Sequence, residues 1–466
     1  MSYKKFSPEL QLVSSKEVEQ RKYRLDPSQY NFETERIIKS CKAKHIKIST
    51  LRRLGWLDEI YLPNRFSRTY TNSKKGIPMI GTSSMLNMRL PNDTRIFINK
   101  IKSGNRLYVE SGDILVSRSG TVGTSVLCGE SYKKYVASDD CIRVRVKEKY
   151  RGYVAAYLKN KYGFSLLAKD AHGKVIKHLK PDDIENLPIM LFDMAEMQAI
   201  NDSMNTAAAK YDEARKLFGL VEELLQQEIG NIIPTVVPAN NIISYDKLIC
   251  TRLDPHMYEP YANYMTNQIF NMRHKLLSDV AEVWGVARFK RHYLEEGNEN
   301  GIELYSSSDI IRGNLSASKY ISRKLNQRNI KKCLVKKDTI LIPCSGAYGG
   351  ILGKGTMAGE LLDGKVVTQH VLRVTKKNDD MYFYYVAAFL CSEKFGYPLV
   401  TATRFGKDIP ELSPETLETI PIPDIDYEAQ KKIGDIFVEA IKAQEEANRL
   451  ENKAVSRIGI LFDLAN

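Results

Sequence analysis

The spacing of apolar side chains predicts one long helix in each half of the chain. Between residues 189 and 234, apolar or small residues recur at steps of three and four, the heptad pattern of a helix that packs along another helix. The same pattern returns between residues 422 and 466. These positions are, in the first half, Met197, Ile200, Met204, Ala207, Tyr211, Ala214, Phe218, Val221, Leu225 and Ile232, and, in the second half, Ala429, Ile433, Ile436, Ala440, Ala443, Ala447, Leu450, Ala454, Ile458 and Leu461.

The sustained pattern in both halves favours pairing of the two helices as an antiparallel coiled coil. Alanine at many positions of the second helix would let the two helices approach closely. A helix of this length spans roughly 50 Å at a rise of about 1.5 Å per residue. The alternative is that each helix packs only on the globular domain that precedes it.

Short β-rich runs fill the remainder of each half. They include DILVSR from residue 113, CIRVRV from 141, TILIPC from 339 and VVTQHVLRV from 366, each bounded by turn-forming residues. One helical stretch per half is also predicted, at 151–167 and at 381–396. The sequence therefore predicts an α/β or α+β fold with mixed, mostly antiparallel sheets.

The sequence contains an internal duplication. RLDP at residue 24 returns at 252, YVAAYL at 153 returns as YVAAFL at 385, and HLKPDDIENLPI at 178 returns as ELSPETLETIPI at 411. GDILVSRSGTVG at 112 is matched by KDTILIPCSGAYGG at 337, an alignment that pairs Asp113 with Asp338. A period of about 230 residues is too long for a solenoid and indicates a duplicated domain. The predicted division is 1–188 and 235–421 for the two domains, and 189–234 and 422–466 for the two helices.

Composition narrows the classes of protein. The 466 residues are 43% hydrophobic and 27% charged, typical of a folded globular protein. The net charge of +13 favours a polyanionic partner such as nucleic acid, although a basic protein without such a ligand is the alternative. Seven scattered cysteines, no apolar run of membrane-spanning length and no secretory signal pattern lead us to expect a cytoplasmic protein without a metal site.

This layout resembles the specificity subunits of Type I restriction–modification enzymes. The resemblance is carried by GDILVSRSGTVG with its second copy, by the NLPI…EMQAI and TIPI…EAQKKI junctions, and by the two RLDP segments. It implies two tandem target-recognition domains that read a bipartite, asymmetric double-stranded DNA sequence, separated by two conserved helices. It also implies partners, namely two methyltransferase subunits and the motor-nuclease subunits.

Residues in the divergent segments are candidates for reading the DNA sequence. They combine cations, hydroxyls and aromatic rings, the groups that contact phosphates and base edges. Ordinary solvated surface is the alternative for each of them. The candidates are, in the first half, Arg65, Arg68, Tyr70, Lys74, Thr82, Ser83 and Ser84, and, in the second half, Arg288, Lys290, Arg291, His292, Ser306, Ser307 and Ser308.

A turn that recurs after a predicted strand supplies further candidates. Arg118 and Ser119 lie in the first copy, where the arginine could contact a phosphate or the O6/N7 edge of guanine. The second copy has Ser345 and Tyr348 and no arginine. The alternative is a hairpin that serves only the fold.

Two basic loops at matching positions are the last candidates. Lys174 follows a glycine in the first copy, and Arg404 and Lys407 flank a glycine in the second. Repetition of a basic loop suggests contacts with backbone phosphates. A helix C-terminus capped by glycine next to a lysine is the alternative.

No catalytic motif is recognisable. The chain lacks the Gly-rich loop and the NPPY-type tetrapeptide of amino-methyltransferases, and GGILGKGT at residue 349 has neither the spacing nor the Ser/Thr of a phosphate loop. Glu451 and Lys453 have nuclease-like spacing, but they lie in a predicted long helix and we interpret them as an exposed pair. We predict a non-catalytic protein without cofactor. The alternatives are a nuclease or methyltransferase with an unrecognised site, or a specificity-like adaptor of another defence system.

Overall fold

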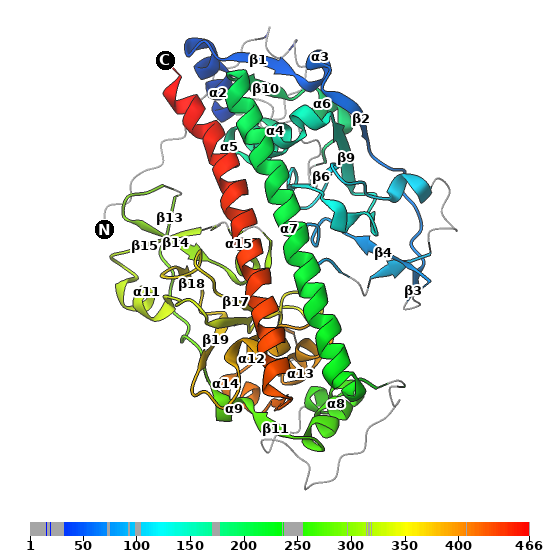
Figure 1. The fold of residues 1–466 in the computed structure, drawn as a ribbon. Coiled ribbons are helices and arrows are strands. Elements are labelled where there is room, and N and C mark those ends of the chain that lie inside the picture. The colour runs from blue at the N-terminus through cyan, green and yellow to red at the C-terminus, as the bar shows by residue number, and fades with distance from the viewer. Residues whose placement is uncertain are drawn as a thin grey trace. The chain divides into compact units, whose positions relative to one another are not determined.

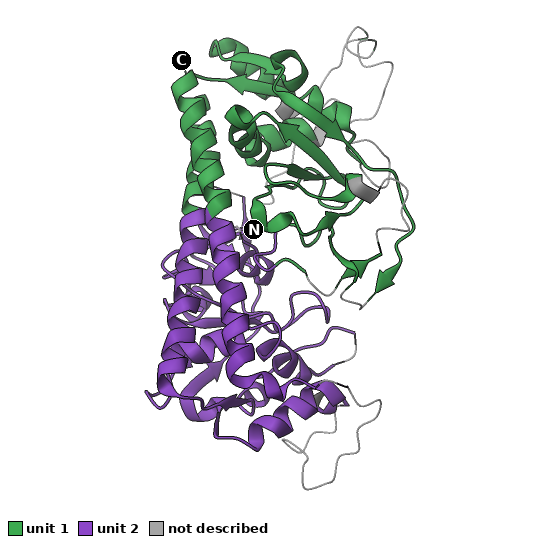
Figure 2. Ribbon diagram, turned by 45° about the vertical axis from the view of Figure 1, so that its right-hand side comes forward, with its two compact units in different colours: residues 1–85, 90–209, 449–466 green, residues 86–89, 210–448 purple. Residues whose placement is uncertain are grey.

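The described part of the chain divides into two compact units. The computed structural model describes residues 15, 19, 32–71, 75–91, 94–97, 104–169, 178–234, 236, 255–295, 297–313, 315, 317, 319–406 and 408–465. Unit 1 comprises residues 1–85, 90–209 and 449–466, and unit 2 comprises residues 86–89 and 210–448 (Figure 2). Each unit therefore takes one segment from each of the two long helices.

The described residues of unit 1 form three small sheets, several of whose strands are labelled in Figure 1. The first has the order β2 (Leu57–Tyr61), β9 (Cys141–Val146), β6 (Ile114–Ser117), β7 (Ser125–Leu127). The second has the order β3 (Tyr70–Thr71), β5 (Arg95–Ile96), β4 (Ile77–Ile80), β8 (Val136–Ala137). The third joins β1 (Lys47–Thr50) to β10 (Pro188–Leu191).

Unit 2 repeats this topology. Its first sheet has the order β12 (Ala281–Trp284), β19 (Val371–Lys376), β16 (Ile340–Pro343), β17 (Thr356–Met357). The second has the order β13 (Tyr293–Leu294), β15 (Lys319–Ser322), β14 (Gly301–Tyr305), β18 (Val366–Val367), and the third joins β11 (His274–Leu276) to β20 (Pro421–Pro423). Among these strands, β4 with β8 and β14 with β18 pair in parallel, and the other pairs are antiparallel. The prediction of a duplicated, mostly antiparallel α/β fold is confirmed.

Short helices flank the sheets. In unit 1 they are α2 (Phe32–Ala43), α3 (Leu51–Leu54), α4 (Glu148–Lys159), α5 (Lys161–Lys169) and α6 (Pro181–Glu185). In unit 2 they are α8 (Pro260–Phe270), α9 (Leu277–Val280), α10 (Ser307–Ile311), α11 (Gln327–Cys333), α12 (Phe383–Leu390), α13 (Gly396–Ala402) and α14 (Pro414–Leu417). None of the helices in the described ranges has the length and apolarity that crossing a membrane would require.

The predicted helix at 151–167 is broken into α4 and α5, which corrects the prediction of one continuous stretch. Asn160 lies at the break in an extended conformation, with ψ at 144°. Its side-chain oxygen accepts from the backbone N–H of Tyr162 at 3.0 Å, and its amide donates to the carbonyl of Val455 at 2.8 Å. An asparagine that caps a new helix and also contacts the C-terminal helix explains the break.

Each central strand is apolar because it is buried on both faces. All four residues of β6 and all four of β16 are buried. In unit 1, Ile114 and Val116 belong to the same apolar cluster as Tyr153 of α4. In unit 2, Ile340 and the helix α12 share the equivalent cluster.

Two long helices, α7 (Met194–Ile229) and α15 (Tyr427–Leu464), confirm the heptad prediction of helix (Figure 1). All ten apolar positions predicted in the first half are buried. In unit 1, the start of α7 shares an apolar cluster with Ala454 and Ile458 of α15. In unit 2, the rings of Phe218 and Phe437 lie 5.8 Å apart. Within each unit the two helices thus pack with opposite directions.

Helix α15 also buries a polar stripe that the apolar pattern did not predict. Glu445 accepts the backbone N–H groups of Glu360 and Leu361 at 3.0 and 2.8 Å. Glu451 is 4% exposed and its carboxylate lies 2.6 Å from the amine of Lys159. Our interpretation of the glutamate as part of an exposed pair was therefore wrong, because Glu451 is buried and pairs with the partly buried Lys159 of α4.

The strand register defines which residues of the two copies are equivalent. Ile114 of β6 pairs with Val144 of β9. Ile340 of β16 pairs in the same way with Val374 of β19. Ile114 is therefore equivalent to Ile340 at the start of the central strand.

This register corrects the sequence alignment, which paired Asp113 with Asp338. The residue equivalent to Asp113 is Thr339, and Asp338 occupies the position of Gly112. Both Gly112 and Asp338 have a left-handed backbone, with φ at 91° and 64°. Aspartate is one of the few residues that tolerate this conformation. Asp338 can therefore stand at the position of Gly112, and in the sequence alignment it was wrongly paired with Asp113.

Candidate nucleic-acid interface

Two candidate arginines of unit 1 meet at one edge of its central sheet. Arg118 directly follows β6, and Asp139 and Asp140 directly precede β9. Because β6 and β9 are antiparallel, these ends lie at the same edge. Arg118 lies 3.5 Å from the carboxylate of Asp140, and Arg68 lies 2.5 Å from that of Asp139. We call Arg68, Arg118, Asp139 and Asp140 the first loop edge.

The first loop edge leaves hydrogen-bonding capacity unused. The Nε of Arg118 is buried and has no hydrogen-bond partner in the part of the chain that the structure describes. Arg68 has a shorter contact with its carboxylate, and the hydrogen bond from Arg68 to Asp139 raises the pKa of the guanidinium. Arg65 is exposed on the same connection. The exposed Arg65 near the partly buried Arg118 suits contacts with phosphates or guanine.

Unit 2 builds a different cluster at the equivalent edge. Arg288 forms an ion pair with Glu411, and the backbone of Ser345 forms an isolated bridge with the same glutamate. His370 directly precedes β19. We call Arg288, Arg291, Ser307, Ser345, His370 and Glu411 the second loop edge.

His370 is the titratable centre of the second loop edge. Partial burial lowers the pKa of its imidazole, and the positive charges of Arg291 and Arg288 lower it further, against an opposing effect of Glu411. The carbonyl of His370 accepts from the hydroxyl of Ser307 at 3.1 Å. This edge is therefore rich in cations and donors while its histidine stays neutral near pH 7.

The serine run of the second half is placed by the structure at the start of α10. Ser306 accepts from the backbone N–H of Asp309 at 3.4 Å and donates to its carboxylate at 2.7 Å. The hydroxyls of Ser308 and Ser306 are 3.0 Å apart. These contacts form an N-terminal cap, so Ser306 and Ser308 have a structural role in addition to any contact with DNA.

Arg404 is part of the frame. It is 4% exposed, and its guanidinium donates to the carbonyl of Thr401 and to the carboxylate of Glu259, each at 2.8 Å. Its outer face lies 4.1 Å from the ring of Tyr348, which is 54% exposed. Tyr348 thus presents an aromatic ring supported by a cation, while Arg404 itself has little access to phosphate.

The remaining candidates are distributed over the surface or lie outside the described residues. Tyr70, Ser83 and Lys290 are exposed, whereas Thr82, Ser119 and His292 are half-buried. Ser84 is half-buried and bonds the backbone of Gly81. Lys74, Lys174 and Lys407 lie outside the residues that the structure describes, as do both RLDP segments apart from Pro255.

Sequence reasoning missed the acidic and imidazole side chains of both edges. Asp139 and Asp140 precede CIRVRV, a predicted strand, so antiparallel pairing with DILVSR could have placed them beside Arg118. Glu411 had no such signal, because its contact with Arg288 joins residues far apart in the sequence. Among the described residues, no group of His, Cys, Asp and Glu is arranged to hold a metal ion.

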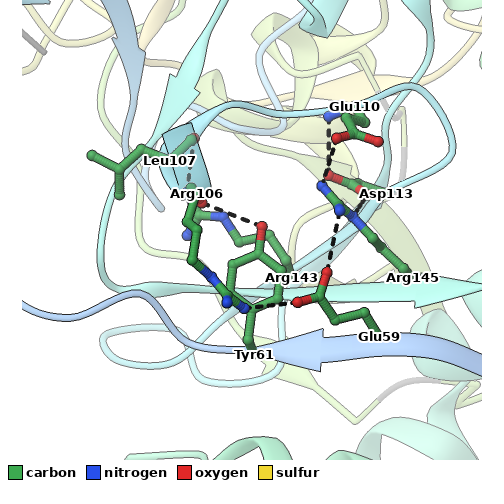
Figure 3. A network of polar contacts seen from close by, with 8 residues as sticks. All are labelled: Glu59, Tyr61, Arg106, Leu107, Glu110, Asp113, Arg143 and Arg145. Atoms are coloured by element: carbon green, nitrogen blue, oxygen red, sulfur yellow. Dashed lines mark hydrogen bonds and ion pairs between the residues drawn. The ribbon is translucent and has the colours of Figure 1, made fainter. Parts of the chain in front are cut away.

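The opposite edge of the same sheet in unit 1 is closed by a network of charges (Figure 3). Arg145 contacts three carboxylates, those of Asp113 at 2.9 Å, Glu110 at 3.0 Å and Glu59 at 3.2 Å. Glu59 also binds Arg106 at 2.7 Å. Asp113 is 2% exposed and its burial raises the pKa of the carboxyl.

The same frame occurs twice, with a different polar edge on each copy, so the protein is internally duplicated. A sequence model of the Type I restriction modification DNA specificity domain matches the chain at residues 52–212 and again at 271–455. The chain therefore belongs to the Type I restriction–modification specificity subunit family, the non-catalytic DNA-recognition component of methyltransferase and restriction complexes. This confirms the resemblance in the sequence.

Individual relatives are distant. The specificity subunit of the Type I restriction enzyme EcoBI from Escherichia coli is 20% identical over 400 residues, which cover 82% of this chain and 77% of that protein. The structure of the S subunit from M. genitalium is 14% identical with a TM-score of 0.37, covering 90% of this chain and 96% of that one. The HsdS subunit from Thermoanaerobacter tengcongensis is 11% identical with a TM-score of 0.27, covering 90% and 97%. The family assignment rests on the sequence matches.

Proposed function

We propose that the chain recognises a bipartite, asymmetric DNA sequence, with one half-site read by each copy of the frame. Support comes from the two loop edges, which occupy the same position on equivalent sheets but carry different side chains. Arg68 and Arg118 beside two aspartates form the first edge, whereas Arg288 and Arg291 around His370 form the second. Equal frames with unequal contacts predict half-sites of different sequence.

The two long helices are proposed to act as the spacer between the half-sites. Regions 1–188 and 235–421 are the proposed recognition domains, and 189–234 and 422–466 are the proposed helical spacers, paired as an antiparallel coiled coil. A duplicated chain offers two equivalent docking surfaces, which fits two copies of the methyltransferase subunit together with motor-nuclease subunits. The cytoplasm is the proposed location.

The decisive experiment is single-molecule sequencing of methylated DNA from cells that express this chain with its methyltransferase partner. We expect a split motif with a fixed gap, absent when this chain is omitted. Replacement of residues 20–188 by those of a relative should change one half of the motif and leave the other half intact. A continuous motif, or methylation that persists without the chain, would refute the proposal.

A further inference from the structure

Unit 2 contains a pocket of about 1140 Å³ where unit 1 has the charge network. Its lining includes residues of β12 and β19, the residues directly before β16, the end of α11, the start of α12, and Gly285, Val286 and Ala287. Pockets that bind small molecules usually have volumes of about 300–1,000 Å³. The pocket therefore has room for a small ligand and some water.

Unit 1 has different residues at the position of this pocket. The ion pair between the buried Asp113 and the partly exposed Arg145 is replaced by Thr339 and Thr375, which both line the pocket. Two threonines occupy less volume than an aspartate and an arginine, and they bring no charge.

A second replacement reverses a charge beside the first. The carbonyl of Glu110 accepts from the backbone of Asp113, and that of Lys336 accepts from the backbone of Thr339 in the same way. Lys336 is therefore equivalent to Glu110, and a cation stands where the first copy has a carboxylate.

The lining of the pocket is strongly cationic. Five lysines and one arginine face one carboxylate, that of Asp338; the cations are Lys331, Lys332, Lys336, Lys337, Lys376 and Arg373. Lys337 pairs with Glu360 at 2.5 Å, and Lys376 pairs with Asp379. No ion pair joins the other three lysines to a residue that the structure describes, and all three are exposed. Three lysines without acidic partners around one cavity form an anion-binding surface.

An aromatic ring forms the other essential part. Trp284 stands at the position of Tyr61, since each pairs in register with the buried arginine of the neighbouring strand. The Cζ of Arg373 lies 5.5 Å from the Trp284 ring, and the arginine is fixed by the carbonyls of its own chain. Trp284 is 37% exposed and Leu334 is 40% exposed. A supported indole with apolar surface beside it suits the stacking of a planar ring.

We propose that this pocket binds a mononucleotide. The lysines Lys331, Lys332 and Lys336 hold its phosphate, and Trp284 stacks on its base. Asp338 and Thr339 of this site precede β16, whereas Ser345 of the second loop edge follows it. The pocket wall at Gly285–Ala287 leads directly to Arg288 of that edge.

Equilibrium dialysis of the purified full chain against labelled adenosine monophosphate tests the proposal. We expect saturable binding, with inorganic phosphate and adenosine each competing at least about tenfold more weakly than the intact nucleotide. Lys331→Ala with Lys336→Ala should weaken nucleotide binding about tenfold or more.

The matched control is Lys324→Ala, which removes an exposed lysine of the same unit outside the pocket and should leave binding unchanged. Circular dichroism melting of each variant identifies any failure to fold. The double variant Lys331→Ala with Lys336→Ala is expected to fold normally, because both lysines are exposed. Absence of binding at about 5 mM nucleotide, or equal binding by the wild type and the lysine variant, overturns the proposal. So does a result in which the lysine variant loses affinity for duplex DNA while the wild type binds no nucleotide.

Discussion

At the start of the central strand, unit 1 has a network of paired charged side chains, whereas unit 2 has a pocket. In unit 1, Arg145 lies among three carboxylates, and the buried Asp113 depends on it. In unit 2, both partners of that pair are threonines. A buried ion pair costs desolvation energy, and removal of one partner is far more harmful than removal of both. The comparison indicates that the frame does not need the ion pair, provided that both charges are lost together.

The largest expected effect is loss of one partner in unit 1. Arg145→Ala leaves the carboxylate of Asp113 buried without its cation, so we expect a loss of about 3 kcal/mol in the free energy of unfolding. Urea denaturation measures it. Thr375→Ala at the equivalent position is the control, with an expected loss of less than about 1 kcal/mol. Equal losses for the two variants would show that the network is not what distinguishes the units.

Removal of both charges should cost less. In the double variant Asp113→Thr with Arg145→Thr, unit 1 receives the pair that unit 2 has, and neither charge of the ion pair remains. We expect a loss of about 1–2 kcal/mol, smaller than that of Arg145→Ala alone. A double-mutant cycle by urea denaturation gives the coupling energy. If the two single losses simply add, the pair is not a coupled unit.

The loop edges allow a comparison of DNA recognition. Arg288→Ala should weaken binding to the cognate site by about 1.5 kcal/mol, because one cation near the DNA is lost. Methylation sequencing should show relaxed specificity confined to one half-site. Arg118→Ala should affect the other half-site, and each variant is the control for the other. Relaxation of both half-sites by either variant would contradict separate readers.

The smallest expected effect is a pH dependence in unit 2. The pKa of His370 is lowered in the folded state by burial and by two arginines. The unfolded state therefore binds the proton more readily than the folded state. The contribution of His370 to the free energy of unfolding is fully present above the unfolded pKa of about 6.5, and it is lost as the pH falls towards the lower pKa of the folded state. Thermal melts of the wild type and His370→Asn between pH 7 and pH 5 measure the difference. A wild type that becomes more stable relative to the variant in acid would disprove this sign.

Periodicity predicted the frame well, because burial leaves a direct trace in the sequence. The heptads of α7 and the apolar run of β6 show which faces are buried. The polar contacts were predicted less well. Glutamate is a residue type that is usually exposed, and Glu451 is buried here beside Lys159, which comes from a helix far away in the sequence. Asp338 and Asp113 are the same residue type and align in the sequence, and only the strand register shows that Thr339 is the structural equivalent of Asp113.

The sharing of the long helices has a consequence for fragments of this protein. Unit 1 includes residues 449–466 from the end of the chain, and unit 2 includes residues 86–89 from near its beginning. A gene cut between the two copies of the repeat would thus encode two pieces that each lack part of their own fold. Each piece would carry what the other is missing, so the two should assemble when co-expressed and aggregate when produced alone. The repeat by which the chain was duplicated is therefore not the unit in which it folds.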